Sequence, residues 1–101
     1  MIQPILVNRL EQVRKILRSH RVKSAFAFGS VCRETFDQES DIDLLVDFED
    51  GIDPIAYGQL YWDLAEQLEK AVDRSVDLVT LSSIRNAYFL QEVEATRETI
   101  L

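Results

Sequence analysis

The amino-acid sequence predicts an α/β (α+β) fold, in which helices pack on a small mixed β-sheet. Stretches with apolar residues at every third or fourth position, typical of amphipathic helices, alternate with short apolar runs typical of buried strands. The resulting order is helix, strand, strand, helix, strand, helix. The chain has 101 residues, of which 47% are hydrophobic and 29% charged, as is usual for a folded protein. Residues 1–101 are therefore predicted to form a single domain.

The first predicted helix covers residues 4–19. Pro4 suits the first turn of a helix, and apolar residues then recur at helical spacing. These residues are Leu6, Leu10, Val13 and Leu17. Basic side chains cluster around residue 20, where they complement the helix dipole. We interpret His20 as part of this helix end rather than as a catalytic base.

Two strands and a second helix follow. Residues 22–28 form an apolar run that ends at Gly29, and residues 42–48 form a second, nearly continuous one. The turn that follows contains Asp53, which is a typical N-cap, directly before Pro54. The helix should run over 54–72, with one apolar face. This face comprises Leu60, Tyr61, Leu64, Leu68 and Val72.

The last part of the chain predicts one more strand and one more helix. The strand should cover residues 75–81, and either Ser82 or Ser83 can cap the helix. Its apolar face would contain Ile84, Tyr88, Leu90 and Val93.

The charge balance limits the partners that the chain can bind. There are 18 acidic and 11 basic residues, a formal net charge of -7, which argues against general binding to nucleic acids or anionic membranes. The single cysteine, Cys32, has no second cysteine to pair with, and is interpreted as a packing residue. Neither a long apolar segment nor a signal-peptide pattern is visible in the sequence, so we expect a cytoplasmic protein.

Two aspartates at the start of the second predicted strand are the first candidate site. Asp41 and Asp43 are two positions apart, so their carboxylates should leave the same face of the strand. Such close like charges repel unless a cation compensates them, and carboxylate oxygens suit Mg²⁺ or Mn²⁺. The alternative is that Asp41 is a turn residue and Asp43 points into solvent.

A possible phosphate-binding turn lies directly after the first strand. Gly29 permits a close approach of the backbone to a ligand, and Ser30 offers an amide and a hydroxyl. Arg33 could contact the same anion, although a capped turn with a surface arginine is the alternative. Asp77 adds a carboxylate within an apolar strand, whereas its rival Asp73 falls in a turn. Three carboxylates could hold two metal ions for phosphoryl-group chemistry.

These residues occur in the order of a known motif. The segments are Gly29-Ser30-x-x-Arg33, Ser40-Asp41-Ile42-Asp43-Leu44-Leu45-Val46, Val76-Asp77-Leu78-Val79 and Ser83-Ile84-Arg85-Asn86-Ala87-Tyr88. Together they resemble the nucleotidyltransferases of the DNA polymerase β type. More narrowly, the chain is similar to the minimal nucleotidyltransferases, which are encoded beside HEPN-domain toxins as their antitoxins. Two positions depart from the family pattern: Glu34 follows Arg33, and Ala87 replaces a proline.

The resemblance implies an activity, cofactors and site residues. Asp41, Asp43 and Asp77 would be the catalytic and metal-binding carboxylates for two Mg²⁺ ions. Gly29, Ser30, Arg33 and Ser40 would bind the nucleotide, ATP. The enzyme would transfer AMP to a tyrosine hydroxyl of a cognate HEPN toxin and so neutralise it. Glu34 would add negative charge close to the phosphates.

Two other functions are consistent with the sequence. The chain could be a binding module that neutralises its partner without catalysis, and the aromatic residues Tyr57, Tyr61 and Trp62 could then form part of an interface. An acidic surface would favour a basic partner. A nucleotidyltransferase that modifies small molecules is disfavoured, because 101 residues leave no room for an acceptor domain.

Overall fold

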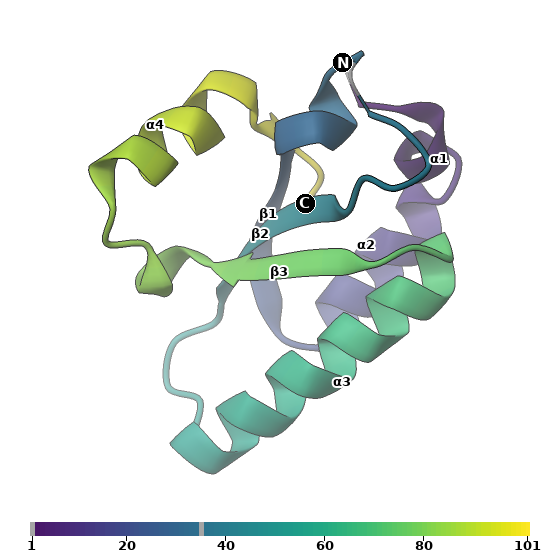
Figure 1. The fold of residues 1–101 in the computed structure, drawn as a ribbon. Coiled ribbons are helices and arrows are strands. Elements are labelled where there is room, and N and C mark those ends of the chain that lie inside the picture. The colour runs from purple at the N-terminus through teal and green to yellow at the C-terminus, as the bar shows by residue number, and fades with distance from the viewer. Residues whose placement is uncertain (1, 35) are drawn as a thin grey trace.

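The computed structural model describes residues 2–34 and 36–101, and its centre is a mixed four-stranded sheet (Figure 1). The strands are β1 (Val22–Phe28), β2 (Ile42–Phe48), β3 (Val76–Thr80) and β4 (Glu98–Thr99), in the order β3-β2-β1-β4. β2 pairs with β3 in parallel, and β1 pairs antiparallel with β2 and with β4. The predicted mixed sheet is confirmed, and the first two strands have the predicted bounds.

Two helices cover one face of the sheet. These are α2 (Leu10–Ser19) and α3 (Pro54–Val72); in Figure 1, α3 runs below the strands and α2 lies behind β3 and α3. Alternate β2 residues pack against them, because side chains of a strand alternate between its two faces. The buried cluster between the layers includes Val13, Leu17, Ile42, Leu44, Val46, Leu64, Leu68 and Val72. Asp53 caps α3 as predicted, with its carboxylate accepting from the Ala56 N–H at 3.2 Å.

A fourth helix, α4 (Ala87–Thr96), packs on the opposite face of the sheet. There Phe28 and Leu45 meet Val93 in a second, smaller buried cluster, and Phe28 contacts the ring edge of Phe89 at a centroid distance of 5.8 Å. This face is only partly covered, so the polar ends of the strands remain accessible beside α4.

His20 joins the two helices of the larger layer. Its ring is buried; Nε2 lies 2.6 Å from Asp63 Oδ2 on α3, and Nδ1 lies 2.8 Å from the Ile16 carbonyl oxygen. His20 is also the C-cap residue of α2. The predicted role at the helix end is confirmed, and the ring additionally holds α2 and α3 together.

The predicted helix over 4–19 is wrong as a single element. The chain forms α1 (Pro4–Val7), leaves helical geometry at Arg9, and starts α2 at Leu10. Asparagine competes with helical hydrogen bonding, so Asn8 is a weak point in the pattern. In addition, the Gln3 N–H donates to the Val31 carbonyl at 2.7 Å, which fixes the direction of α1 independently of α2.

The start of the last helix also differs from the prediction. Leu81–Ser83 forms a short 3₁₀ turn, and the Ser83 hydroxyl donates back to the Thr80 carbonyl at 2.8 Å rather than capping a helix. The cap is Asn86, whose Oδ1 accepts from the N–H groups of Tyr88 and Phe89. Because the helix begins later, its buried face changes: Tyr88 is 82% exposed and Leu90 is 38% exposed.

This assignment predicts the effect of two alanine substitutions. Asn86→Ala should lower the free energy of unfolding by about 1 kcal/mol, because two amide groups at the start of α4 lose their acceptor. Ser82→Ala should change it by less than about 0.5 kcal/mol, as expected for an exposed residue that caps nothing. Urea unfolding followed by circular dichroism measures both. An equal loss in the two variants would contradict the observed helix start.

The outer edge of β3 is covered by the chain's own side chains. Ser75 accepts from the Ile42 N–H of β2, so Val76, Leu78 and Thr80 direct their backbone groups away from the sheet. Glu69 Oε2 accepts from the Val76 N–H at 3.0 Å, and the Tyr61 hydroxyl donates to the Leu78 carbonyl at 2.6 Å. Together with the bond from the Ser83 hydroxyl to Thr80, these contacts occupy much of the edge.

In the described part of the chain, no helix has both the length and the apolar character needed to cross a bilayer.

Candidate functional site

The sheet register places two of the three predicted carboxylates side by side. Asp43 of β2 pairs with Asp77 of β3 and, on its other side, with Phe28 of β1. Paired residues of neighbouring strands direct their side chains to the same face. Asp43 therefore lies on the face that carries α4, with Asp77 as its direct neighbour.

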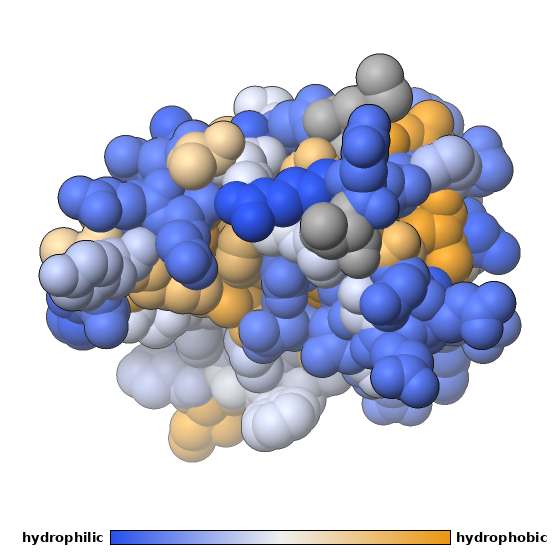
Figure 2. Space-filling model, turned by 45° about the horizontal axis from the view of Figure 1, so that its top comes forward, coloured by the Kyte–Doolittle hydropathy of each residue, from blue (hydrophilic) through white to orange (hydrophobic). Residues whose placement is uncertain are grey.

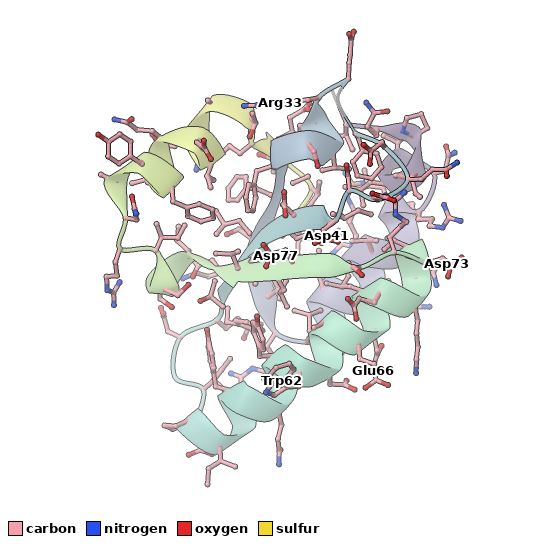
Figure 3. The ribbon with its side chains drawn as sticks, viewed as in Figure 1. Arg33, Asp41, Trp62, Glu66, Asp73 and Asp77 are labelled. Atoms are coloured by element: carbon pink, nitrogen blue, oxygen red, sulfur yellow. The ribbon has the colours of Figure 1, made fainter. Side chains whose placement is uncertain are left out.

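Asp41 lies just before β2, two positions from Asp43, and it is exposed. Figure 3 shows Asp41 and Asp77 at neighbouring positions along the front of the sheet, whereas Asp73 lies at the far end of α3. Asp73 is the left-handed C-cap of that helix, as expected for a turn residue. In residues 2–34 and 36–101, no three His, Cys, Asp or Glu side chains already converge closely enough to hold a metal ion.

A pocket of about 210 Å³ opens between the carboxylates and α4. Its walls come from the end of β1, the 3₁₀ turn η1 (Gly29–Cys32), the start of β2 and of β3, and α4. The lining residues are Phe28, Gly29, Arg33, Asp43, Asp77, Phe89, Glu92 and Thr96. Arg33 is the basic residue among those that line this pocket. In Figure 3 its side chain extends from the end of η1 towards α4. Figure 2 shows this side of the molecule as mainly hydrophilic, with hydrophobic side chains visible between the polar ones.

Gly29 is required at its position for two independent reasons. Its φ of +70° lies in the left-handed region, which L side chains rarely adopt. A Cβ at Gly29 would also overlap with Oδ2 of Asp43. The Gly29 N–H donates to Thr96 Oγ1 at 2.9 Å, so the same residue anchors the end of α4. Gly29 thus allows both the Asp43 carboxylate and the end of α4 to lie close to the backbone of the η1 turn.

The electrostatics of the pair fit a cation. Burial of Asp43, together with the charges of Asp77 and Asp41, raises the pKa of the Asp43 carboxyl to about 6. Each of these causes disfavours the ionised form, and a bound divalent cation would reverse the effect of all three. Carboxylate oxygens are also the ligands that Mg²⁺ prefers. The residues present therefore suit Mg²⁺, with substrate phosphates and water completing its coordination.

The other predicted site residues, Asp41, Ser30 and Ser40, do not line this pocket. Ser30 belongs to η1, where its carbonyl accepts from the Arg33 N–H. The Ser40 hydroxyl is engaged within its own loop, where it donates to Asp37 Oδ1 at 3.0 Å. Glu34 is exposed and lines a separate pocket with Cys32 and Gln3. The roles of Ser30 and Ser40 in nucleotide binding stay predictions.

Cys32 is buried, and burial, with the charge of nearby Glu98, raises the pKa of its thiol to about 11. A thiol that stays protonated at neutral pH is a poor nucleophile. This observation agrees with the packing role that the sequence indicates.

Besides Phe28, the three pocket residues of α4 were not identified as site residues in the sequence. Phe89, Glu92 and Thr96 all belong to α4 and lie on the side of the helix that faces Gly29 and Asp43. Their spacing of three and four residues is that of one helix face. The sequence pattern could have indicated these residues only if the last helix had been predicted to begin after Asn86 and to pack beside the ends of the strands.

Comparison with known proteins adds to this geometry. Residues 11–101 match the family model described as "Polymerase beta, Nucleotidyltransferase". The chain belongs to this nucleotidyltransferase family. A relative of this nucleotidyltransferase is the candidate protein adenylyltransferase MJ1379 of Methanocaldococcus jannaschii. It is 38% identical over 93 residues, which cover 84% of this chain and 91% of the relative.

Two solved structures resemble this nucleotidyltransferase over most of its length. A toxin-antitoxin structure with AMP-PNP has a TM-score of 0.71 and 32% identity, and the match covers 91% of this chain and 72% of that chain. A complex of tri-AMPylated Shewanella oneidensis HEPN toxin with MNT antitoxin has a TM-score of 0.66 and 29% identity, and covers 94% and 71% of the two chains. The resemblance to minimal nucleotidyltransferases is thus confirmed in both sequence and fold.

Proposed function

We propose that this nucleotidyltransferase is an antitoxin that transfers AMP from ATP to a tyrosine hydroxyl of a cognate HEPN toxin and thereby neutralises it. The observation that carries the proposal is the pairing of Asp43 with Asp77 beside the Gly29 turn, in a chain of the nucleotidyltransferase family. Similar solved structures support the substrate and the partner: one is a toxin-antitoxin structure with AMP-PNP, and another is a complex of an AMPylated HEPN toxin with its MNT antitoxin.

We assign the metal-binding role to Asp41, Asp43 and Asp77, and propose two Mg²⁺ ions held jointly with the triphosphate. When bound, Mg²⁺ would neutralise phosphate charge and stabilise the attacking and leaving oxygens. Arg33 at the pocket wall suits a phosphate oxygen, since a guanidinium can donate two parallel hydrogen bonds. Gly29 and Ser30 would hold the terminal phosphates at the η1 turn, with Ser40 as a further nucleotide contact.

The proposed reaction is a single displacement at phosphorus. The tyrosine oxygen forms a bond to the α-phosphorus of ATP, the bond from that phosphorus to the bridging oxygen breaks, and pyrophosphate leaves. Asp77 is exposed at the edge of the pocket, where an oxygen of its carboxylate can accept the tyrosine proton. Asp43 is less exposed than Asp77 and suits the binding of the cation that would neutralise the phosphate charge.

A cytoplasmic location belongs to the same proposal, because the nucleotide and a toxin that acts inside the cell would both be available there. The net charge of the chain is consistent with binding to such a toxin. A formal net charge of -7 favours association with a basic partner, such as a protein that itself binds RNA.

The test is label transfer from ATP that is radioactive at its α-phosphate. With Mg²⁺ and a purified cognate HEPN toxin, label should appear covalently on the toxin. It should be absent when EDTA removes the metal, and when the acceptor tyrosine of the toxin is replaced by phenylalanine. Stable neutralisation of the toxin without any transferred label would instead indicate a binding module that acts by complex formation alone.

A further inference from the structure

A second depression lies on the other side of β3, between this strand and α3. Its volume is about 320 Å³, and its walls include Tyr61, Trp62 and Ala65 of α3 and Leu78 of β3. Trp62 is 73% exposed, although its ring packs edge-on against Tyr61 at a centroid distance of 5.5 Å. A large aromatic side chain that is held in place yet open to solvent is typical of an interface anchor.

This groove and the candidate active-site pocket share one residue at the edge of the sheet. Asp77 lines both the pocket that contains Asp43 and the groove that contains Trp62, because β3 is the edge strand between them. Figure 3 shows the same relation: Asp77 projects from β3, and Trp62 and Glu66 lie on the adjacent stretch of α3. A polypeptide that lies along the groove would therefore come within reach of the Asp77 carboxylate at this edge.

The charge of the groove has one sign. Glu66, Glu69 and Asp77 are part of its wall, and in the described part of the chain no lysine or arginine lines it. Glu66 forms an exposed ion pair with Lys70 at 3.2 Å, and the Glu69 carboxylate accepts a hydrogen bond from the Val76 N–H. Both remain acidic groups next to an aromatic ring. Carboxylates beside a tryptophan face are a suitable environment for an arginine or lysine side chain.

We propose that the groove between α3 and β3 binds a basic segment of the acceptor protein and so presents the acceptor hydroxyl to Asp77. This inference rests on the proposed function. The occupant carries an arginine or lysine that stacks on Trp62 and faces Glu66, close in its own structure to the modified tyrosine. It binds through side chains rather than as an added strand, because Tyr61, Glu69 and Ser83 already occupy the edge of β3.

Two groove variants and two matched controls test the proposal. Trp62→Ala removes the aromatic anchor, and Ile55→Ala removes an equally exposed apolar side chain, 74% exposed, from the same helix outside the groove. Glu66→Lys reverses a charge in the groove, and Asp50→Lys reverses one in the loop before α3. Thermal unfolding of all four verifies that each variant is folded.

Two quantities are measured for each variant with the cognate HEPN toxin. The first is KM for the toxin in AMP transfer, with KM for ATP as an internal reference, and the second is the Kd of the complex without nucleotide, by calorimetry. For Trp62→Ala we expect KM for the toxin and Kd to rise about tenfold or more, as for an interface anchor, with KM for ATP unchanged. For Glu66→Lys both should rise several-fold, and the controls should match the unmodified chain.

Several results would overturn the inference, and they are distinct from a failure of the proposed function. Equal toxin KM and Kd values for Trp62→Ala and Ile55→Ala would exclude the groove as the docking site. So would a chain that forms a dimer through Trp62 while toxin binding is unaffected. If the unmodified chain transfers no AMP, the proposed function fails. In that case the Kd values still test whether the groove is the docking site. Weaker toxin binding confined to the groove variants would support the groove, and equal Kd values in all variants would overturn it.

Discussion

Replacing Asp43 with asparagine should abolish AMP transfer and, in the absence of metal, make the protein more stable. The loss of activity should be on the order of 10³-fold or more, because several kcal/mol of transition-state stabilisation depend on the cation that this carboxylate would hold. The gain in stability follows from the site itself. Asp43 is half-buried beside Asp77, and an asparagine of the same shape carries no charge that must be desolvated.

The stability effect should depend on pH in a defined direction. The pKa of the Asp43 carboxyl is about 6 in the folded chain, against an ordinary value of 3.8, so between these values the folded state binds more protons than the unfolded state. Stability of the unmodified chain therefore falls as pH rises through this window. After allowance for solvent screening, the cost at pH 7.5 is about 1 to 2 kcal/mol.

Thermal unfolding in EDTA measures this difference. Asp43→Asn should unfold several degrees higher than the unmodified chain at pH 7.5, roughly 4–8 °C for each kcal/mol in a domain of this size. The gap should shrink as the pH falls and approach zero below about pH 3, where the unmodified carboxyl is protonated in both the folded and the unfolded state. Asp47→Asn, a change on the same strand outside the pocket, serves as control. A lower melting temperature for Asp43→Asn at pH 7.5 would mean that the carboxylate contributes favourably without metal.

Gly29→Ala should damage both stability and activity, with a larger effect than the backbone alone explains. The left-handed φ of +70° costs an alanine about 1 kcal/mol or somewhat more. The new Cβ would also displace the Asp43 carboxylate that lies against it. Because a shift of about 1 Å in a catalytic group can cost about 10²-fold in rate, we expect AMP transfer to fall by at least that factor.

Gly51→Ala provides a matched control for this prediction. Gly51 has a φ of +79°, and a Cβ there would meet no atom within 4 Å. It should therefore show the backbone cost of about 1 kcal/mol without loss of transfer. Chemical unfolding and label transfer are measured on both variants. If Gly29→Ala lost no more activity than Gly51→Ala, close packing of Asp43 on the turn would not matter for catalysis.

The sequence predicted those elements whose signals are local. The first two strands have the expected bounds because each is an apolar run with a sharp polar or glycine boundary, and Asp53 with Pro54 marks the start of α3 clearly. The single helix over 4–19 was wrong because apolar spacing continues across Asn8 while the backbone does not. The two residues of β4 are too few to produce a pattern, and only their pairing with Phe26 and Ala27 defines them.

The candidate site was predictable to the extent that it depends on motif and strand order. Placing Asp77 next to Asp43 required only that two apolar strands be neighbours. The contact between Gly29 and Asp43 depends on the exact antiparallel register, in which Phe28 pairs with Asp43. The contribution of Thr96 was outside the reach of sequence reasoning, since it lies 67 positions from Gly29 and depends on where α4 begins.

The covered edge of β3 also determines how this protein behaves in a crowded cell. Open strand edges are the places where sheets of different molecules join and grow into aggregates. Here the Leu78 carbonyl, the Val76 amide and the Thr80 carbonyl are each occupied from within the same chain. Copies made in excess of their partner are therefore less prone to join through this edge, which suits a protein that must be available before its toxin is active.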